Sequence, residues 1–285
     1  MNRRWQNVRH QLRHQLRRNR PAQFSLLVLF IFVVAALSAG LSPYDPDQMS
    51  LASRMLPPNA AHWFGTDEYG RDYFTRALSG GRISLMVGFL AMLFSTLIGT
   101  LVGTISGYFG GWLDNLMMRA VDILMAIPAF FLLLVLNAYL KPGVDNIIMI
   151  ISLLTWMNMS RLVRAETLSV KEREYVLYAR ASGENPLRII ARHIIPGVLP
   201  TIIVAATLNI ASAILMESTL SFLGLGVQQP AASWGSMLNN AQSYIGDASW
   251  LAMFPGILIL LTVFSFNVLG DVFRTAFEPG ANRDA

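Results

Sequence analysis

Between two apolar blocks the chain reads Arg161-Leu-Val-Arg-Ala-Glu-Thr-Leu-Ser-Val-Lys-Glu-Arg-Glu-Tyr175, continues through Ala179-Arg-Ala-Ser-Gly183 and ends at His193-Ile-Ile-Pro196. The flanking blocks are long enough to cross a membrane, so this charged stretch connects two spans. A chain this rich in apolar residues holds few charges, and it gathers many of them here. We interpret the stretch as a docking element on the inner face of a membrane protein, shaped to be moved by a partner.

The composition indicates a membrane protein. Hydrophobic residues make up 54% of the 285 residues and charged residues only 14%, against about 25% in an average soluble domain. The chain has no cysteine, which excludes a disulfide framework and a thiolate metal site. The net charge of +5 could suggest nucleic acid. The basic residues flank apolar spans, however, so we expect no nucleic-acid partner.

The two lysines exclude a nucleotide-binding loop in this chain. A phosphate-binding loop requires Gly-Lys-Ser/Thr, whereas Lys141 follows Leu140 and Lys171 follows Val170. The four histidines are scattered and lack the spacing of a zinc site with a general base. We therefore expect no catalytic residue, metal site or cofactor here, and any nucleotide hydrolysis belongs to another polypeptide.

Six apolar segments predict six transmembrane helices. A spanning helix needs about 20 mostly apolar residues, and such segments fall at 24–41, 84–107, 120–140, 146–163, 200–222 and 251–272. With the N-terminus inside, 17 of the 22 basic residues lie on the inner side. Inner segments carry the excess of Lys and Arg, so we expect both termini to be cytoplasmic.

The spans divide the chain into five parts. We expect a basic cytoplasmic tail over 1–23, a first transmembrane helix over 24–41, an extracytoplasmic segment over 42–83, a core of five helices over 84–275 with an inner loop over 164–199, and a cytoplasmic tail over 276–285. The seven arginines of residues 1–20 suit contact with anionic membrane lipid. A mitochondrial-type presequence, or a secretory signal cleaved near Ser38-Ala-Gly40, is the alternative.

The inner loop predicts two short helices separated by a turn. Residues 171–182 can form the first, Gly183 favours a left-handed stop, and Pro186 fits the first turn of the second. One face of the second helix is formed by Leu187, Ile190, Ala191 and Ile194. A helix lying on lipid headgroups is the alternative, but it would not need rigid turns at both ends.

Three polar residues inside the spans are candidates for a translocation path: Glu217, Asn209 and Asn158. An ionisable residue in a span is a functional candidate by default. Glu217 could line the path, or it could pair with an arginine or lie near the interface. The two asparagines are weaker candidates for the same role.

Small residues recur at four-residue spacing in the second span, at Gly99, Gly103 and Gly107. They form a ridge that lets helix backbones approach closely. The ridge predicts either packing within the chain or contact with another subunit.

The outer segment gathers opposite charges at Asp67, Glu68, Arg71 and Asp72. Charges so close in sequence can pair locally. We expect a structural or receptor-facing surface there rather than a metal site.

The spacing from Gly183 to Pro196 resembles the EAA loop of type I ATP-binding-cassette (ABC) importer permeases. In that family the segment is the coupling helix that docks on the ATPase subunit. Leu177, Tyr178 and Ala179 stand where the family has Glu-Ala-Ala. The resemblance implies an ATPase-coupling role for Tyr175, Ala179, Gly183, Leu187, Ile190, Ala191, Ile194 and Pro196.

Further stretches resemble the C permease subunit of dipeptide, oligopeptide and nickel importers. They are His62-Trp-Phe-Gly-Thr-Asp-Glu-Tyr-Gly-Arg-Asp72, Arg82-Ile-Ser84, Ser221-Phe-Leu-Gly-Leu-Gly-Val227, Ser233-Trp-Gly-Ser-Met237 and Asn267-Val-Leu-Gly-Asp271. These matches keep the family's order and extend over nearly all of the chain after residue 43.

The resemblance implies an all-α membrane protein with the six-helix type I permease fold, in the bacterial cytoplasmic (inner) membrane. It implies a second homologous permease subunit, two ATP-binding subunits that hold ATP and Mg, and an extracytoplasmic substrate-binding protein as partners. The implied cargo is a di- or oligopeptide, with nickel or a metal chelate as the alternative. A stand-alone secondary transporter or channel is the alternative of another class. Such carriers usually hold several buried ionisable groups, and here only Glu217 qualifies clearly.

Overall fold

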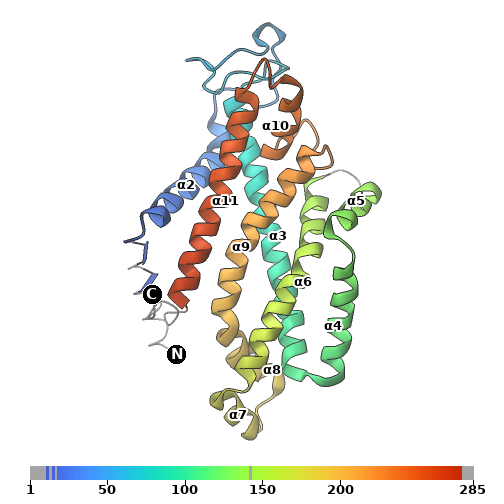
Figure 1. Ribbon diagram of the computed structural model, residues 1–285. Coiled ribbons are helices and arrows are strands. Elements are labelled where there is room, and N and C mark those ends of the chain that lie inside the picture. The colour runs from blue at the N-terminus through green and yellow to red at the C-terminus, as the bar shows by residue number, and fades with distance from the viewer. Residues whose placement is uncertain (1–10, 13–14, 17, 141–142, 278–285) are drawn as a thin grey trace.

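The computed structural model describes residues 11–12, 15–16, 18–140 and 143–277. Most of the predicted basic tail, Lys141 and residues 278–285 of the predicted C-terminal tail lie outside the described residues. Within them the chain folds into long helices that run alongside one another (Figure 1).

Five segments of the described chain are long and apolar enough to cross a membrane, or six if one bent pair counts as a span. They are Arg20–Leu41 (α2, Arg20–Leu37, with η1, Ser38–Leu41), α3 (Tyr73–Phe109), α6 (Val144–Lys171), Pro186–Phe222 (α8, Pro186–Ile189; η3, Ile190–Ile194; α9, Ile195–Phe222) and α11 (Trp250–Phe277). These segments match five of the six predicted spans, and the predicted all-α membrane fold is confirmed.

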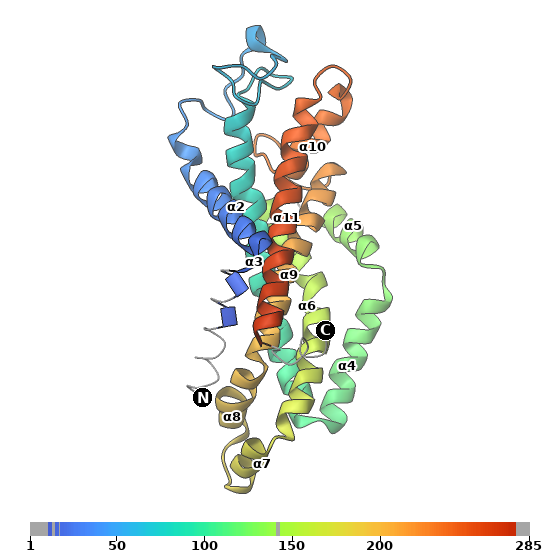
Figure 2. The same ribbon diagram turned by 60° about the vertical axis from the view of Figure 1, so that its left-hand side comes forward.

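The sixth predicted span, 120–140, is the bent pair. Helices α4 (Gly111–Ala126) and α5 (Ala129–Tyr139) meet at an angle of 82°. Pro128 causes the break, because a proline ring disfavours the helical region for the residue before it. Ile127 accordingly has an extended backbone, with φ −83° and ψ 124°. Both helices lie at one edge of the bundle, beside α6 (Figure 2).

Helix α3 begins within the predicted extracytoplasmic segment, at Tyr73. Asp72 caps it, since its Oδ2 accepts a hydrogen bond from the Thr75 backbone N–H at 2.8 Å. An aspartate in this position satisfies a backbone donor that the first turn leaves free. The helix therefore projects beyond the apolar stretch from which the span was predicted.

The glycine ridge of α3 packs against α6. A Cβ on Gly103 would lie 2.5 Å from the Ser160 carbonyl oxygen and 2.8 Å from the Val163 Cβ. Cβ atoms on Gly99 and Gly107 would meet Met159 and Thr167 of α6 equally closely. Of the two predicted alternatives, packing within the chain is the one observed.

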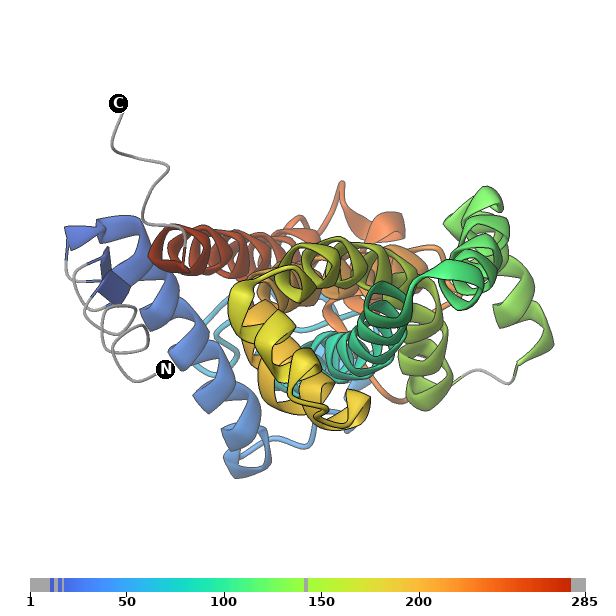
Figure 3. The same cartoon turned by 90° about the horizontal axis from the view of Figure 1, so that it is seen from below.

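The remaining helices complete a bundle with two distinct ends. Helix α3 also packs on α9, α9 on α11, and α11 on α2, and a view from below places α2 and α4 on opposite sides (Figure 3). One end, called here the loop end, carries residues 42–72 with η2 (Leu51–Ser53) and the helix α10 (Trp234–Ala241) with η4 (Gln242–Tyr244). The other, called the hairpin end, carries α7 (Glu174–Ala181) and α8.

Charged residues of the loop end are buried and paired. The Arg71 Nε lies 2.6 Å from the Asp67 Oδ2, and both side chains are buried. Arg76, also buried, contacts Asp47 at 3.0 Å. Burial raises the pKa of the neighbouring Glu68 carboxyl above its ordinary value. The predicted local pairing is thus observed, and it lets a charged segment pack tightly.

Candidate functional site

The charged stretch between the two spans forms a helical hairpin. Helix α6 continues to Lys171, α7 follows over Glu174–Ala181, and α8 with η3 leads directly into α9. The hairpin protrudes from its end of the bundle (Figures 1 and 2). All eight residues with a predicted coupling role lie in this hairpin or at its junction with α9.

Gly183 makes the turn between the two arms of the hairpin. Its φ of 77° lies in the left-handed region that favours glycine. The Gly183 N–H donates to the Arg180 carbonyl at 3.0 Å, and the Glu184 N–H donates to the Ala179 carbonyl at 3.1 Å. This pair of bonds is a Schellman-type helix stop. The left-handed turn predicted at Gly183 is confirmed.

Asn185 and Pro186 start the second arm. The Asn185 Oδ1 accepts a hydrogen bond from the Leu187 backbone N–H at 2.9 Å, and Pro186 occupies the first helical turn. Proline suits this position because its missing N–H would have no partner there. The predicted stop at Gly183 and the predicted helix start at Pro186 are therefore observed. The second turn, expected at Pro196, is not, because α8 and η3 run directly into α9.

The predicted single apolar face of the second arm is wrong. Leu187 is 70% exposed and Ala191 is also exposed, whereas Ile190 and Ile194 are 7% and 0% exposed. The cause is η3, a π-helical turn over Ile190–Ile194. A π-turn holds more residues than an α-turn, so the spacing expected for an α-helix does not apply across it.

The buried face of the second arm fastens the hairpin to the bundle. Ile194 packs with Val170 of α6, Val176 and Ala179 of α7, and Val198 of α9. Ile189, which the sequence analysis did not single out, is buried in the same cluster. Displacement of the hairpin must therefore act on α6 and α9 together.

Both arms of the hairpin expose apolar, aromatic and charged side chains. Leu187 and Ala191 are exposed on the second arm, and Tyr178 is 76% exposed on the first. Tyr175 is exposed, and Pro196 is half-buried. Four arginines are exposed on the hairpin: Arg173, Arg180, Arg188 and Arg192. In the sequence, Tyr178 differs from the family's Glu-Ala-Ala pattern, and this difference is the only sign that marks it.

A hydrogen bond braces the second arm of the hairpin. The His193 Nε2 lies 3.2 Å from the Glu184 Oε2, and the His193 ring lies against the Tyr175 ring with 6.2 Å between centroids. The pair links the Gly183 turn to η3, across the full length of α8.

Two ion pairs join α6 to α4. Arg164 of α6 forms two bonds of 2.6 Å to the Asp114 carboxylate of α4, which also accepts from Ser106 of α3. Arg161 pairs with Asp122. A bidentate arginine–carboxylate pair fixes geometry as well as charge. The helix α6, which leads into the hairpin, is therefore bonded to α4, and α4 is bonded to α3.

Of the three predicted path residues, Glu217 is fully enclosed by this chain. It is 0% exposed on α9, and its carboxylate accepts hydrogen bonds from the hydroxyls of Ser84, Ser218 and Ser221. Asn209 is half-buried on α9 and Asn158 is exposed on α6. The role of these three residues in a path stays a prediction.

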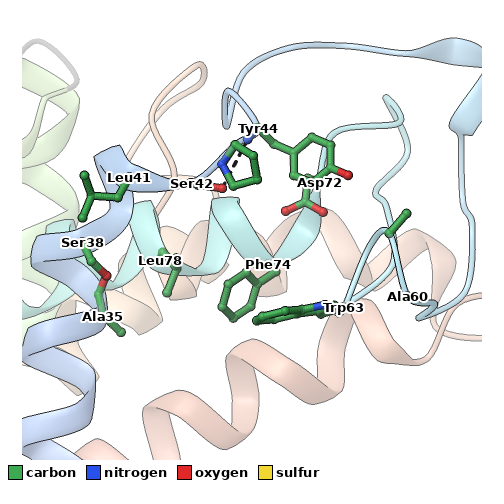
Figure 4. Close-up of a pocket in the computed structure, with 12 residues that line it drawn as sticks. Ala35, Ser38, Leu41, Ser42, Tyr44, Ala60, Trp63, Asp72, Phe74 and Leu78 are labelled. Carbon is green, nitrogen blue, oxygen red and sulfur yellow. Dashed lines mark hydrogen bonds between the residues drawn. The ribbon is translucent and has the colours of Figure 1, made fainter.

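A cavity of about 470 Å³ lies at the loop end (Figure 4). The end of α2, the segment after it and the start of α3 line it, with the Trp63 and Phe74 rings close to each other at 5.0 Å between centroids. Asp72 on its wall binds His62 and Thr75, so its carboxylate is engaged within the protein. In the part of the chain that the structure describes, no cluster of three or more His, Cys, Asp or Glu could hold a metal ion.

The chain matches two family models and resembles known proteins along most of its length. Residues 99–283 match the family model of the binding-protein-dependent transport system inner membrane component, and residues 4–58 match the N-terminal transmembrane domain of oligopeptide transport permease C. The dipeptide transport system permease protein DppC of Bacillus subtilis is 42% identical over 94% of this chain and 85% of its own length. The probable D,D-dipeptide transport system permease protein DdpC of Escherichia coli is 40% identical over 90% of this chain and 86% of its own length.

A solved structure shares the fold. An inward-facing conformation of the MetNI methionine ABC transporter aligns with a TM-score of 0.60 over 70% of this chain and 96% of that chain, at 20% identity. The bundle is therefore that of a type I ABC importer permease. Together with the two family models and the relatives that match along most of its length, this fold shows that the chain belongs to the family of binding-protein-dependent transport system inner membrane components, among the C permeases of the peptide transporters.

Proposed function

We propose that this chain is one transmembrane subunit of an ATP-driven importer of di- or oligopeptides. The observation that carries the proposal is the hairpin. It is a rigid, exposed element fastened to two spanning helices, in a chain whose relatives over about nine-tenths of its length are named peptide permeases. A second homologous permease completes the path, and an extracytoplasmic binding protein delivers the peptide at the loop end. Two ATP-binding subunits, which hold ATP and Mg, sit against the hairpin end.

Orientation follows from the same assembly. The hairpin end faces the cytoplasm of a bacterium, the loop end faces outward, and both termini are cytoplasmic. The excess of basic residues in the inner segments supports this arrangement.

The hairpin couples ATP hydrolysis to movement of the spans. Leu187, Ala191 and Tyr178 present an apolar surface that fits a groove on an ATP-binding subunit. When ATP closes the two ATP-binding subunits, each groove carries its hairpin with it. Because Ile194 and Val176 pack against α6 and α9, these helices tilt together, and the population shifts between two packings of the bundle.

Uptake by the reconstituted complex tests the proposal. The permease pair, the two ATP-binding subunits and the binding protein are assembled in proteoliposomes, and entry of a labelled dipeptide is followed with and without ATP. We expect uptake that needs both ATP and the binding protein and that an excess of unlabelled peptide suppresses. Uptake of nickel that peptides do not suppress would favour the metal alternative. Transport by this chain alone, without ATP, would favour the stand-alone carrier.

A further inference from the structure

The Glu217 carboxylate sits inside a cage of serine hydroxyls. Its Oε2 accepts from the Ser84 Oγ at 3.1 Å and from the Ser218 Oγ at 3.5 Å, and its Oε1 accepts from the Ser221 Oγ at 2.7 Å. Ser84 belongs to α3, and the other residues belong to α9. The carboxylate thus joins two spanning helices through hydroxyl groups and is fully buried between them.

Two of these hydroxyls also accept hydrogen bonds from a third segment, residues 223–241. The Ser84 Oγ accepts a hydrogen bond from the Trp234 backbone N–H at 3.2 Å, and the Ser221 Oγ accepts one from the Val227 backbone N–H at 3.0 Å. A hydroxyl has a single hydrogen to donate. Since each donates it to Glu217, its lone pairs face the incoming N–H. The carboxylate therefore orients both serines as acceptors for residues 223–241.

Residues 223–241 pack backbone to backbone against the cage. A Cβ on Gly235 would lie 2.6 Å from the Ser218 Cα, and one on Gly226 would lie 2.4 Å from the Ser221 Cα. The Trp234 ring is buried and donates its Nε1–H to the Ala77 carbonyl at 2.9 Å. The segment turns back at Gly224, whose φ is 77°, so it is a folded plug rather than an open loop.

This plug lies well inside the loop end. Ser84 is 11 residues after the first residue of α3, which corresponds to about 16 Å along the helix. Helix α10 packs on α3, α9 and α11. In Figure 1 it lies between the upper ends of α11 and α9. Irregular backbone within a membrane protein needs partners inside the protein, and here the oriented serines provide them for Val227 and Trp234.

We propose that Glu217 is the positioning residue of an outer gate, and that the gate is the segment 223–241. The carboxylate holds the two serines as acceptors, the serines hold the Val227 and Trp234 N–H groups, and the plug stays seated between α3, α9 and α11. When these helices separate, Ser84 on α3 and Ser221 on α9 move apart and the plug loses both anchors together. The proposal rests on the proposed function in taking the loop end as the outer side, and the trapped-state measurement below uses the proposed partners.

The absence of cysteine from the sequence allows a clean test. Val227→Cys places one thiol at a position that is 5% exposed in the plug, and the bond made by its backbone N–H does not depend on the side chain. The assembled transporter is reconstituted and the rate of reaction with a membrane-impermeant maleimide is measured. We expect slow labelling at rest, and labelling at least tenfold faster when loaded binding protein, ATP and vanadate trap the outward-open state.

Adding Glu217→Ala should make Val227→Cys react quickly at rest, close to the trapped rate. Ser84→Ala should raise the resting rate as well, while Ser84→Thr, which keeps the hydroxyl, should restore slow labelling. A second reporter, Val163→Cys, lies in the α3–α6 seam and is fully buried. It should stay unlabelled in every one of these backgrounds.

Three results would overturn the gate. Resting labelling of the Glu217→Ala protein at the original rate would show that the cage does not seat the plug. Labelling of both reporters would show a general loss of packing, and equal rates for Ser84→Ala and Ser84→Thr would remove the hydroxyl from the argument. The resting measurement needs no transport. Fast resting labelling of the Glu217→Ala protein, together with no peptide uptake by the complex that keeps Glu217, would therefore sink the proposed function and leave the cage standing.

Discussion

Replacing Leu187 by alanine is the sharpest test of the hairpin surface. The side chain is 70% exposed, and alanine removes three of its carbon groups. At about 0.8 kcal/mol for each buried CH₂, the full loss is roughly 2.4 kcal/mol, and the 70% that a partner can still cover is about 1.7 kcal/mol. This corresponds to an affinity for the ATP-binding subunit about 15- to 20-fold lower.

The assay is a binding titration. The permease pair is held in nanodiscs, labelled ATP-binding subunit is added, and the dissociation constant is read from the titration curve. Leu260→Ala is the matched control, because Leu260 is a leucine of similar exposure, 64%, on α11. We expect the control to bind as the unchanged protein does. Equal affinity for the Leu187→Ala and Leu260→Ala proteins would falsify the docking surface.

A buried residue of the same arm separates docking from folding. Ile194 is 0% exposed in the cluster that fastens the hairpin, and its replacement by alanine should cost about 2–5 kcal/mol of stability. The Leu187→Ala protein should keep the melting temperature of the unchanged protein. A drop in melting temperature as large as that of the Ile194→Ala protein would mean that Leu187 supports the fold and not a partner.

Three further results are expected. Gly183 has a φ of 77°, and a Cβ there would meet nothing within 4 Å. Gly183→Ala should therefore lower the stability of the turn by about 1–2 kcal/mol through backbone strain alone, and Gly183→Val should lower coupled transport further. Equal, near-normal peptide uptake by both variants would contradict the left-handed turn. Gly103→Ala should lower the melting temperature, because its Cβ would lie 2.5 Å from a backbone oxygen and such overpacking lowers stability by about 1–3 kcal/mol. Gly256→Ala, whose Cβ would meet nothing within 4 Å, should leave the melting temperature unchanged. The same melting temperature for both variants would argue against close packing of α3 on α6. The pKa of Glu68 is raised in the folded protein, so the folded state binds this proton more tightly than the unfolded state does. The contribution of Glu68 to stability is therefore present below the unfolded pKa and is lost as the pH rises through the folded pKa. Glu68→Gln should raise the melting temperature at pH 8 and not at pH 4, and an equal rise at both pH values would refute this direction of the pKa shift.

Local rules were sufficient for the turns of the hairpin. Gly183 and Pro186 occupy positions where backbone geometry alone selects glycine and proline, and the structure shows both as predicted. The apolar spans could be predicted as well, because a helix that crosses a bilayer needs about 20 mostly apolar residues in a row. The bend at Pro128 does not follow from the apolar pattern, because the run is apolar on both sides of the proline and has the length of one span, although proline disfavours a continuous helix.

Features that depend on register or on distant partners could not be predicted. The face of α8 was inferred from the α-helical repeat, and the π-turn at Ile190–Ile194 breaks that repeat. The cage around Glu217 needs Ser84, which lies 133 residues away in the chain. Nothing in the local sequence of either residue indicates the other, so Glu217 could be recognised as unusual without its partners being known.

The π-turn makes the direction of the hairpin sensitive to the length of the chain as well as to its side chains. A π-turn is an α-helix that has accepted an inserted residue. Loss of one codon between Ile190 and Ile194 would return the segment to an α-helix and rotate α8 by about 100° relative to α9. Leu187 would then point away from its groove although no residue of the contact had been replaced. A one-residue deletion here should therefore weaken the proposed coupling even though every contact residue is kept.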